Sequence, residues 1–360
     1  MMEVAWFSAL CDDDYEFLGV ASPDLRSSWE HCSDIVKRAE ANGYDNVLLP
    51  SGYDLGIDAN AFAAAIATHT SKINLLLAVR CAELWPPQLA RQIATIDRMA
   101  QGRLVINIIS SDLPGAPLTS GPRYRRSTEV MQLVRSLLDG EAVDFDGEFY
   151  QLKLGVPSVH TVSGKCPPFY FGGLSDDARD CAATAADVYL MWPDTVAHVT
   201  EIMNDMKGRA AERHRTLKFG YRVHVVVRET ESQARDAADR LLSKLDADVG
   251  DAIRAKSLDS QSVGVRRQAE LRESAAAGDG YVEDNLWTGI GRARSGCGAA
   301  IVGDPDQVLA KLQTYESMGI DALILSGYPH IDECDLFAKY VLPKLDHRPL
   351  HTPVQVGNDR

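Results

Sequence analysis

Two cationic side chains share one face of a predicted strand in the second half of the chain. Residues 219–227 are typical of a β-strand, and successive side chains of a strand point to opposite faces. The alternate valines then form an apolar face, and Arg222 and His224 share the other. Burying these two groups costs roughly several kcal/mol unless they meet a counter-charge. We expect an anionic substrate or cofactor here; the alternative is a structural pairing with an internal carboxylate.

Other candidate residues follow the ends of predicted strands, where parallel α/β folds place their ligands. Trp192 ends one run, and Tyr328 and His330 end another. Arg294 lies in a glycine-rich segment, 289–296, and glycine lets a backbone approach a ligand closely. Each candidate has a structural alternative: an aromatic residue in the core, a turn at the adjacent proline, or a solvated loop charge.

A Gly-Gly-Leu-Ser segment marks a predicted junction between a strand and a helix. Helix N-termini bind phosphate through free amide groups and the positive end of the helix dipole. Gly172 and Gly173 would let the backbone approach such a group, whereas Ser175 could equally be an ordinary N-cap without a ligand. The segment is a candidate phosphate site.

Eight short apolar runs recur along the chain, each followed by a segment with helical spacing. They predict parallel strands at residues 4–10, 46–51, 73–80, 104–110, 168–173, 188–192, 218–228 and 322–328. Helices are predicted between them, for example at residues 28–41, 87–100 and 304–318. Eight such units predict an α/β fold, the TIM (β/α)8 barrel with insertions.

Two connections are longer than usual loops. The first, 112–162, contains a predicted helix at 128–138, and the second and larger, 231–303, separates strands seven and eight. The middle of the second, 257–280, is either a mobile active-site lid or a surface insertion. No low-complexity linker marks a boundary, so we expect a single domain over residues 1–360.

Composition disfavours several classes of function. The net charge of -14 argues against nucleic acid or an anionic membrane as a partner. The seven cysteines are scattered, without CxxC pairs or an HExxH motif, so we expect neither a disulfide framework nor a metal site. No apolar run is long enough to span a membrane, and no secretory signal precedes the first strand, which predicts a cytoplasmic protein.

Motifs over nearly the whole chain carry a family resemblance. They are Arg91-Gln92, Thr95-Ile96-Asp97-Arg98, Gly102-Arg103, Arg123-Tyr124, Tyr170-Phe171-Gly172-Gly173, Tyr221-Arg222-Val223-His224, Asn285-Leu286-Trp287, Gly289, Arg294, Val302-Gly303-Asp304 and Ser326-Gly327-Tyr328-Pro329-His330. Together they resemble the alkanesulfonate monooxygenase branch of the bacterial-luciferase-like flavin monooxygenase family.

The resemblance implies a two-component enzyme on a TIM barrel. A separate NAD(P)H-dependent flavin reductase would supply FMN as FMNH2, and with O2 the enzyme would convert an organosulfonate into sulfite and an aldehyde. Arg222 and Arg294 would hold the sulfonate or the oxygenated flavin, since forked cationic donors suit such anions. His224 and Tyr328 would handle protons.

The resemblance also implies how the cofactor lies. The FMN phosphate would sit on Gly172, Gly173 and Ser175, with Tyr124 and Asn107 close to the rest of the cofactor. Closure of the lid would bring Arg294 over the flavin and exclude water.

The chain departs from the alkanesulfonate pattern around the expected substrate pocket. Cys11 and the acidic run Asp12-Asp13-Asp14 follow the first strand, where those enzymes have a histidine, and residues 51–58 lack their cysteine. Carboxylates accept sugar hydroxyls and tryptophan packs on sugar rings, so the substrate is either an alkanesulfonate or a sulfosugar such as sulfoquinovose. The candidate substrate-binding residues are Trp6, Cys11, Tyr53, Asp54, Trp85, Trp192 and His330.

Two other interpretations remain open at this point. The same barrel also suits a deazaflavin-dependent oxidoreductase that transfers hydride, and a flavin-binding protein without catalytic activity. Apolar outer helices suggest a homodimer or homotetramer.

Overall fold

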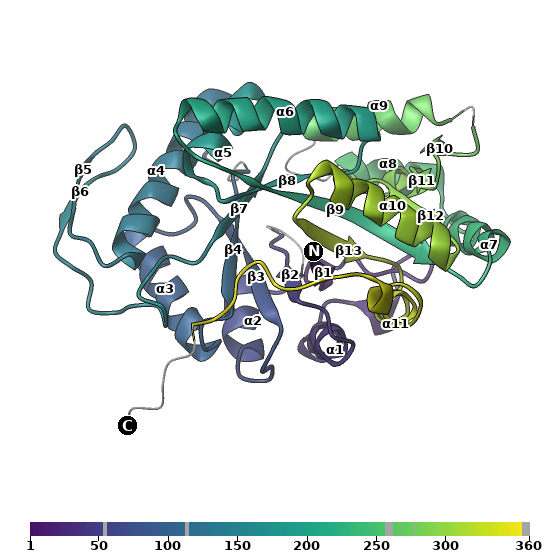
Figure 1. The fold of residues 1–360 in the computed structure, drawn as a ribbon, viewed down its shortest axis with the longest axis horizontal. Helices are drawn as coiled ribbons and strands as arrows, with labels where there is room; N and C mark the ends of the chain where they lie inside the picture. The colour runs from purple at the N-terminus through teal and green to yellow at the C-terminus, as the bar shows by residue number, and fades with distance from the viewer. Residues whose placement is uncertain (53–55, 112–114, 256–261, 277, 355–360) are drawn as a thin grey trace.

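Eight parallel strands close into a barrel with helices around it, within the part of the chain described by the computed structural model (Figure 1). That part comprises residues 1–52, 56–111, 115–255, 262–276 and 278–354. Around the barrel the strands are β1 (Glu3–Phe7), β2 (Asn46–Leu49), β3 (Asn74–Arg80), β4 (Leu104–Ile109), β7 (Phe169–Gly172), β8 (Val188–Met191), β9 (Lys218–Val227) and β13 (Ala322–Ser326). The pairings of β8 with β9 and of β13 with β1 close the ring. The predicted TIM barrel and its eight strands are confirmed.

Helices cover the outside of the barrel. They are α1 (Trp29–Ala41), α2 (Ala59–Ile66), α3 (Pro86–Met99), α4 (Ser120–Leu138), α5 (Asp176–Ala185), α6 (Val196–Glu212), α10 (Pro305–Met318) and α11 (His330–Tyr340). Most begin at a side chain that accepts a hydrogen bond from the first turn, and Asp304 forms a full capping box with Gln307. The three predicted helices are confirmed, whereas α4 begins at Ser120 rather than at 128.

The alternation of side chains along each strand separates two apolar layers. The inner layer fills the barrel with Ala5, Phe7, Leu48, Leu76, Val105, Tyr170, Val188, Ala322 and Ile324. The outer layer lies between strands and helices and contains Val4, Trp6, Val47 and Val223. On β9, Val223, Val225 and Val227 face outward, so Arg222 and His224 occupy the inward face, as the sequence predicts.

The long insertion after β9 continues the barrel sheet. It contains α7 (Glu231–Leu242), α8 (Ala247–Ala255), α9 (Val263–Ser274), β10 (Tyr281–Glu283), β11 (Leu286–Trp287), the short 3-10 helix η2 (Gly289–Arg292) and β12 (Ala300–Gly303). β12 runs parallel to the second half of β9, from Ala300 opposite His224 to Gly303 opposite Val227. The first half of β9 pairs with β8. The insertion is therefore built onto the strand that carries the two cationic side chains.

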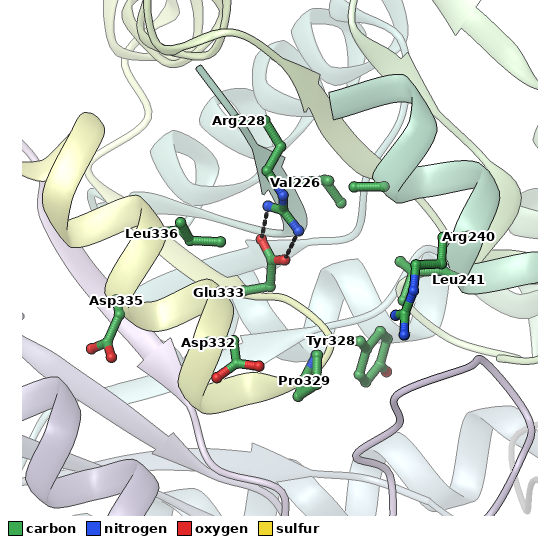
Figure 2. Close-up of a pocket in the computed structure, with 11 residues that line it drawn as sticks. Val226, Arg228, Arg240, Leu241, Tyr328, Pro329, Asp332, Glu333, Asp335 and Leu336 are labelled. Carbon is green, nitrogen blue, oxygen red and sulfur yellow. Dashed lines mark hydrogen bonds and ion pairs between the residues drawn. The ribbon is translucent and has the colours of Figure 1, made fainter. Parts of the chain in front are cut away.

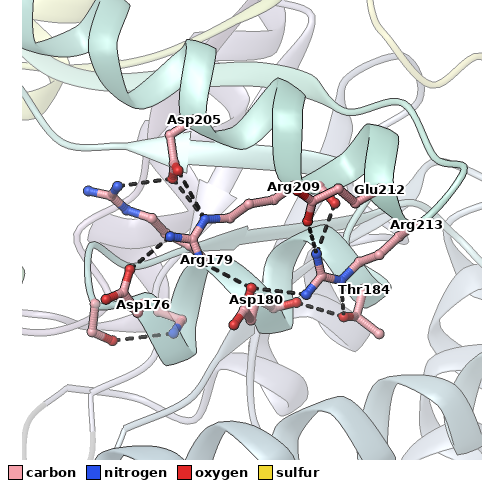
Figure 3. Close-up of polar contacts among 10 residues, drawn as sticks. Asp176, Arg179, Asp180, Thr184, Asp205, Arg209, Glu212 and Arg213 are labelled. Carbon is pink, nitrogen blue, oxygen red and sulfur yellow. Dashed lines mark hydrogen bonds and ion pairs between the residues drawn. The ribbon is translucent and has the colours of Figure 1, made fainter.

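A polar network joins α5 to α6 (Figure 3). The guanidinium of Arg209 on α6 bonds the carboxylates of Asp176 at 2.8 Å, Asp180 at 3.0 Å and Asp205 at 2.9 Å. Asp176 is the first residue of α5, so the network fixes the start of the helix that follows β7.

The other connections are short or surface elements. A hairpin of β5 (Val143–Asp146) and β6 (Gln151–Leu154) follows α4, and the 3-10 helices η1 (Pro23–Leu25) and η3 (Leu342–Lys344) lie near the two ends of the chain. None of the described helices is long and apolar enough to cross a membrane.

Candidate active site

His224 lies at the carboxyl end of the barrel, among side chains from β9, β13 and the insertion. Its Nδ1 is 2.7 Å from the hydroxyl of Ser326 on β13. Its ring stacks on that of Tyr328, with 5.1 Å between the ring centres. Burial lowers the pKa of His224 well below its usual value, and the positive charges of Arg222 and Arg294 lower it further. His224 is therefore neutral at physiological pH.

Arg222 is a buried cation without a carboxylate partner among the described residues. Its guanidinium lies 4.4 Å from the ring centre of Phe7, and Nη1 donates to its neighbour's backbone at Val223 O, 3.3 Å away. Nη2 is buried and has no hydrogen-bond partner in the described part of the chain. Burial lowers the pKa of Arg222. The internal carboxylate of the structural alternative is thus not observed there, which favours an anionic ligand.

Arg294 lies in the insertion, and its side chain reaches the cluster formed by His224, Arg222 and Tyr328. Its Nη1 donates to Asp13 Oδ2 at 2.8 Å and to the hydroxyl of Tyr328 at 2.7 Å. Burial lowers the pKa of Arg294, but the neighbouring Tyr328 and Asp13 outweigh it and raise the pKa well above the usual value. Arg294 is therefore not a solvated loop charge: Asp13 holds it over the end of the barrel.

A second histidine is bonded to the next acidic residue. His330 Nδ1 lies 3.0 Å from Asp14 Oδ1, and His31 Nε2 lies 2.9 Å from Asp14 Oδ2. Burial alone would raise the pKa of Asp14, but its contact with His330 and hydrogen bonds from both histidines lower it below its usual value. Asp14 is therefore ionised although its side chain is fully buried.

Four buried polar atoms of this group have no partner among the described residues. They are Asp13 Oδ1, Arg222 Nη2, His224 Nε2 and His330 Nε2. Buried polar groups normally find a hydrogen-bond partner. The cluster therefore fits a polar ligand, and the two guanidinium groups favour an anion.

The candidate cofactor residues lie around the turn between β7 and α5. A Cβ added to Gly172 would lie 2.6 Å from Leu190 O. Gly173 has a φ of +155°, and a Cβ added there would lie 2.6 Å from Ala178 Cβ and 3.3 Å from the Tyr124 hydroxyl. Only glycine allows this close packing. The Ser175 hydroxyl caps α5 by accepting from Ala178 N. These residues fit the phosphate of a flavin, because an exposed glycine backbone and a tyrosine hydroxyl meet at a helix N-terminus.

Asn107 and Trp192 lie at other strand ends. Asn107 is half-buried on β4, opposite Tyr170. Trp192 follows β8 and is enclosed by the insertion, since a Cβ on Gly264 or Gly296 would come within 3.1 or 3.2 Å of its ring.

The structure does not bring all predicted substrate contacts together. Trp6 points outward from β1, fully buried against Tyr44 with 5.3 Å between ring centres. We correct its assignment: alternation along β1 places Phe7, not Trp6, inside the barrel. Trp85 is 56% exposed at the start of α3, where its ring meets that of Tyr150. Cys11 is half-buried beside the acidic run.

Two candidates cannot be placed, since Tyr53 and Asp54 lie outside the described residues.

Sequence reasoning missed the roles of Phe7, Asp13, Asp14 and His31. The acidic run was noted only as a departure from a family pattern. Its place directly after the first predicted strand was the available signal, because strand ends of a barrel face the ligand. His31 offered no signal, since it reaches Asp14 only through packing of α1 beside β1.

A cavity of about 460 Å³ lies on the other side of Tyr328. Figure 2 shows the ion pair at its wall, in which Arg228 Nη2 bonds Glu333 Oε1 at 2.6 Å. The cavity is lined by Val226, Arg228, Ala237, Arg240, Leu241, Tyr328, Pro329, Asp332, Glu333, Asp335 and Leu336. Tyr328 thus lines this cavity and also stacks on His224 in the cluster around Arg222.

Comparison with known proteins gives close relatives. The model of the luciferase-like monooxygenase family matches residues 7–322. A protein of Novosphingobium aromaticivorans described as sulfoquinovose monooxygenase is 66% identical over 356 residues, which cover 97% of this chain and 98% of that protein. A protein of Agrobacterium fabrum with the same description is 52% identical over 347 residues, covering 95% and 89%.

Solved structures share the fold at low sequence identity. The crystal structure of riboflavin lyase with modified FMN and riboflavin has a TM-score of 0.78 and 16% identity, covering 98% of this chain and 94% of that one. DmoA from Hyphomicrobium sulfonivorans has a TM-score of 0.76 and 17% identity, covering 96% and 88%.

Proposed function

We propose that this chain, which belongs to the luciferase-like monooxygenase family, is an FMNH2- and O2-dependent monooxygenase that releases sulfite from sulfoquinovose. Two relatives with that description support the proposal. The observation that carries it is the buried guanidinium of Arg222, which has no carboxylate partner among the described residues and lies with Arg294 beside the same ring, Phe7. A sulfonate supplies the missing negative charge.

The reaction changes the carbon that bears the sulfonate. That carbon loses its bond to sulfur and one hydrogen and gains a double bond to one oxygen atom; sulfite and water are the other products. FMNH2, bound at Gly172, Gly173, Ser175, Tyr124 and Asn107, would supply the two electrons that activate O2. A separate NAD(P)H-dependent flavin reductase would regenerate it.

The protein's own groups bind and orient the substrate. Arg222 and Arg294 hold the sulfonate through forked N–H donors. The Tyr328 hydroxyl accepts from Arg294 and so keeps its own hydrogen to donate; burial raises its pKa, which keeps it protonated. The insertion excludes water, since α9 is tied to the barrel by Arg267 and Gln268.

A hydroxylated substrate fits the acidic run better than an alkyl chain does. Asp13 binds Arg294 with one oxygen, and its other oxygen, Oδ1, is buried without a partner among the described residues. A sugar hydroxyl would satisfy this acceptor, whereas an alkyl chain would leave it unpaired, at a cost of about 1–3 kcal/mol. The relatives' description does not favour hydride transfer to a deazaflavin or a non-catalytic role.

Sulfite release tests the proposal. The protein is incubated with FMN, NAD(P)H, a flavin reductase and air, and with either sulfoquinovose or octanesulfonate. We expect sulfite from sulfoquinovose at a rate about 5- to 160-fold higher, the ratio that an unpaired buried acceptor costing about 1–3 kcal/mol gives. Equal or faster release from octanesulfonate would contradict the sugar substrate, and no sulfite from either would contradict the monooxygenase.

A further inference from the structure

We propose that His330 Nε2 accepts a proton during the reaction, and that Asp14 and His31 are the positioning residues that make it able to do so. The inference rests on the proposed function and deepens it. It gives the acidic run after β1 a part in the chemistry, beyond its contact with Arg294.

The three residues come from separate elements. His330 is the first residue of α11, Asp14 lies in the connection after β1, and His31 is on α1. Asp14 Oδ1 accepts from His330 N at 3.0 Å and lies 3.0 Å from His330 Nδ1. The side chains of Asp14 and His330 are fully buried, whereas that of His31 is 11% exposed. The buried carboxylate therefore holds one histidine inside the site and a second at its edge.

The carboxylate fixes the tautomer of His330. An ionised Asp14 can only accept, so the ring nitrogen that faces it, Nδ1, carries the hydrogen. In the neutral ring Nε2 then has a free lone pair. Nε2 is buried and bonded to none of the described residues. The ring also contacts Phe7 and Tyr328, with 5.6 and 5.2 Å between ring centres, and these two rings contact Arg222 and His224.

The two buried histidines differ in what surrounds them. Burial and two neighbouring guanidinium groups oppose a positive charge on His224, and its Nδ1 meets a neutral hydroxyl, Ser326. His330 Nδ1 instead meets the carboxylate of Asp14, and no guanidinium contact to its ring is observed among the described residues. The titratable groups that face His330 are Asp14 after β1, His224 on β9 and Tyr328 after β13; His31 on α1 faces Asp14.

The proton that His330 accepts is one that the reaction must release. When the sulfonate carbon becomes a carbonyl carbon, its bond to sulfur breaks and sulfite leaves with that electron pair. One hydrogen of the carbon leaves as a proton, and the electrons of that C–H bond form the second carbon–oxygen bond as the bond between the two atoms of O2 breaks; the other oxygen atom ends as water. Nε2 takes this proton, Nδ1 keeps its own, and the imidazolium pairs with Asp14. After sulfite and the aldehyde leave, the proton passes to water.

Nitrogen NMR of the flavin-free protein provides a first test, independent of activity. In ¹⁵N-histidine-labelled protein we expect the His330 ring, assigned with His330→Gln, to carry hydrogen on Nδ1 and none on Nε2. In Asp14→Asn we expect this single tautomer to be lost, because an amide can donate to Nδ1 as well as accept from it. Asp12→Asn is the matched control, since that carboxylate lies in the same loop but bonds Ser27 N, at 2.7 Å. Hydrogen on Nε2 in the neutral ring of the wild-type protein, or an unchanged tautomer in Asp14→Asn, would overturn the proposal.

The pH dependence of sulfite release is the second test. In Asp14→Asn we expect kcat to fall at least about 10-fold and the acidic limb of its pH profile to move, because a negative charge beside the proton acceptor is removed. A merely structural role would lower kcat without moving the limb, and that result overturns the proposal. His31→Gln keeps a hydrogen-bond donor to Asp14, so we expect it to move the acidic limb in the same direction but less than Asp14→Asn does. It replaces Asp14→Asn as the test if that variant does not fold. If wild-type protein releases no sulfite, the proposed function fails and the NMR result alone decides the tautomer.

Discussion

Arg222 shows how a single residue can oppose stability and serve function. It is 5% exposed, and its charge meets no carboxylate among the described residues. Replacing even a buried ion pair with apolar side chains of similar volume is often neutral or stabilises a protein by about 1–4 kcal/mol, and an unpaired charge has no ion pair to lose. For Arg222→Met we expect the free energy of unfolding to rise within that range, measured by urea denaturation, while sulfite release falls about 100-fold or more.

The matched variant for this test is Arg228→Met. Arg228 is paired with the buried carboxylate of Glu333, which the variant leaves without its partner. Its free energy of unfolding should therefore fall, by about 3 kcal/mol. A loss of stability in both variants would show that Arg222 is satisfied in the folded protein and would contradict an anion site.

His224 makes folding depend on pH. Its pKa is lowered in the folded protein, so the unfolded chain binds the proton more tightly. This contribution to stability is complete above the unfolded value of about 6.5 and is lost progressively as the pH falls below it. In wild-type protein we expect the free energy of unfolding to fall by up to about 1.4 kcal/mol for each pH unit below about 6.5. His224→Gln should remove this dependence on pH. His160→Gln, at an exposed histidine, should keep the slope.

At the scale of elements, the junction of β7 and α5 is the most sensitive to one methyl group. Gly173 has a φ of +155°, and an added Cβ would lie 2.6 Å from Ala178 Cβ. Gly173→Ala should therefore displace the start of α5 and weaken FMN binding about 10-fold or more, measured by fluorescence quenching. Gly208→Ala is the control: nothing lies within 4 Å of its Cβ position on α6, so it should stabilise the helix by about 1 kcal/mol with FMN affinity unchanged. Equal FMN affinity in both variants would place the phosphate elsewhere.

The attachment of α9 governs how well the insertion shields the reaction. Arg267 bonds both oxygens of Asp194, at 2.7 and 2.8 Å, and Asp194 is 2% exposed. Arg267→Met should loosen α9 and admit water, so more hydrogen peroxide and less sulfite form per NAD(P)H consumed. The neighbouring Arg266 is exposed and has no ion pair with a described residue; Arg266→Met should keep the wild-type ratio. An unchanged ratio in Arg267→Met would mean that this contact does not control closure.

The elements were predictable because their signals are local, and the site was only partly so. Apolar runs and caps such as Asp304 locate strands and helices, and alternation along β9 placed Arg222 and His224 inside. Two aromatic residues are adjacent on β1, and the register of the strand decides which of them faces inward. The sequence leaves this register open, so it predicts Trp6 as a substrate contact and misses Phe7. The contact between His31 and Asp14 spans two elements and has no local signature.

For the molecule as a whole, the shared strand predicts cooperative unfolding. β12 pairs with β9, and Trp287 on β11 packs against Val226 of β9. Because every strand of the insertion among the described residues belongs to the barrel sheet, we expect one domain and one transition. Fluorescence of a variant that keeps only Trp287 and far-ultraviolet circular dichroism should give the same midpoint. An earlier midpoint for Trp287 would show that the insertion unfolds separately.

β9 changes neighbours along its length, from β8 in its first half to β12 in its second, and His224 is the residue at which the second partner begins. This sets the limits for exchanging segments between homologues. A graft that stays within residues 231–280 would exchange only the part of the insertion outside the barrel sheet. A graft that includes β12 would also replace the strand that pairs with β9 at His224. Swaps intended to change substrate preference should therefore end before β10, and swaps that cross into β12 should carry β9 from the same donor.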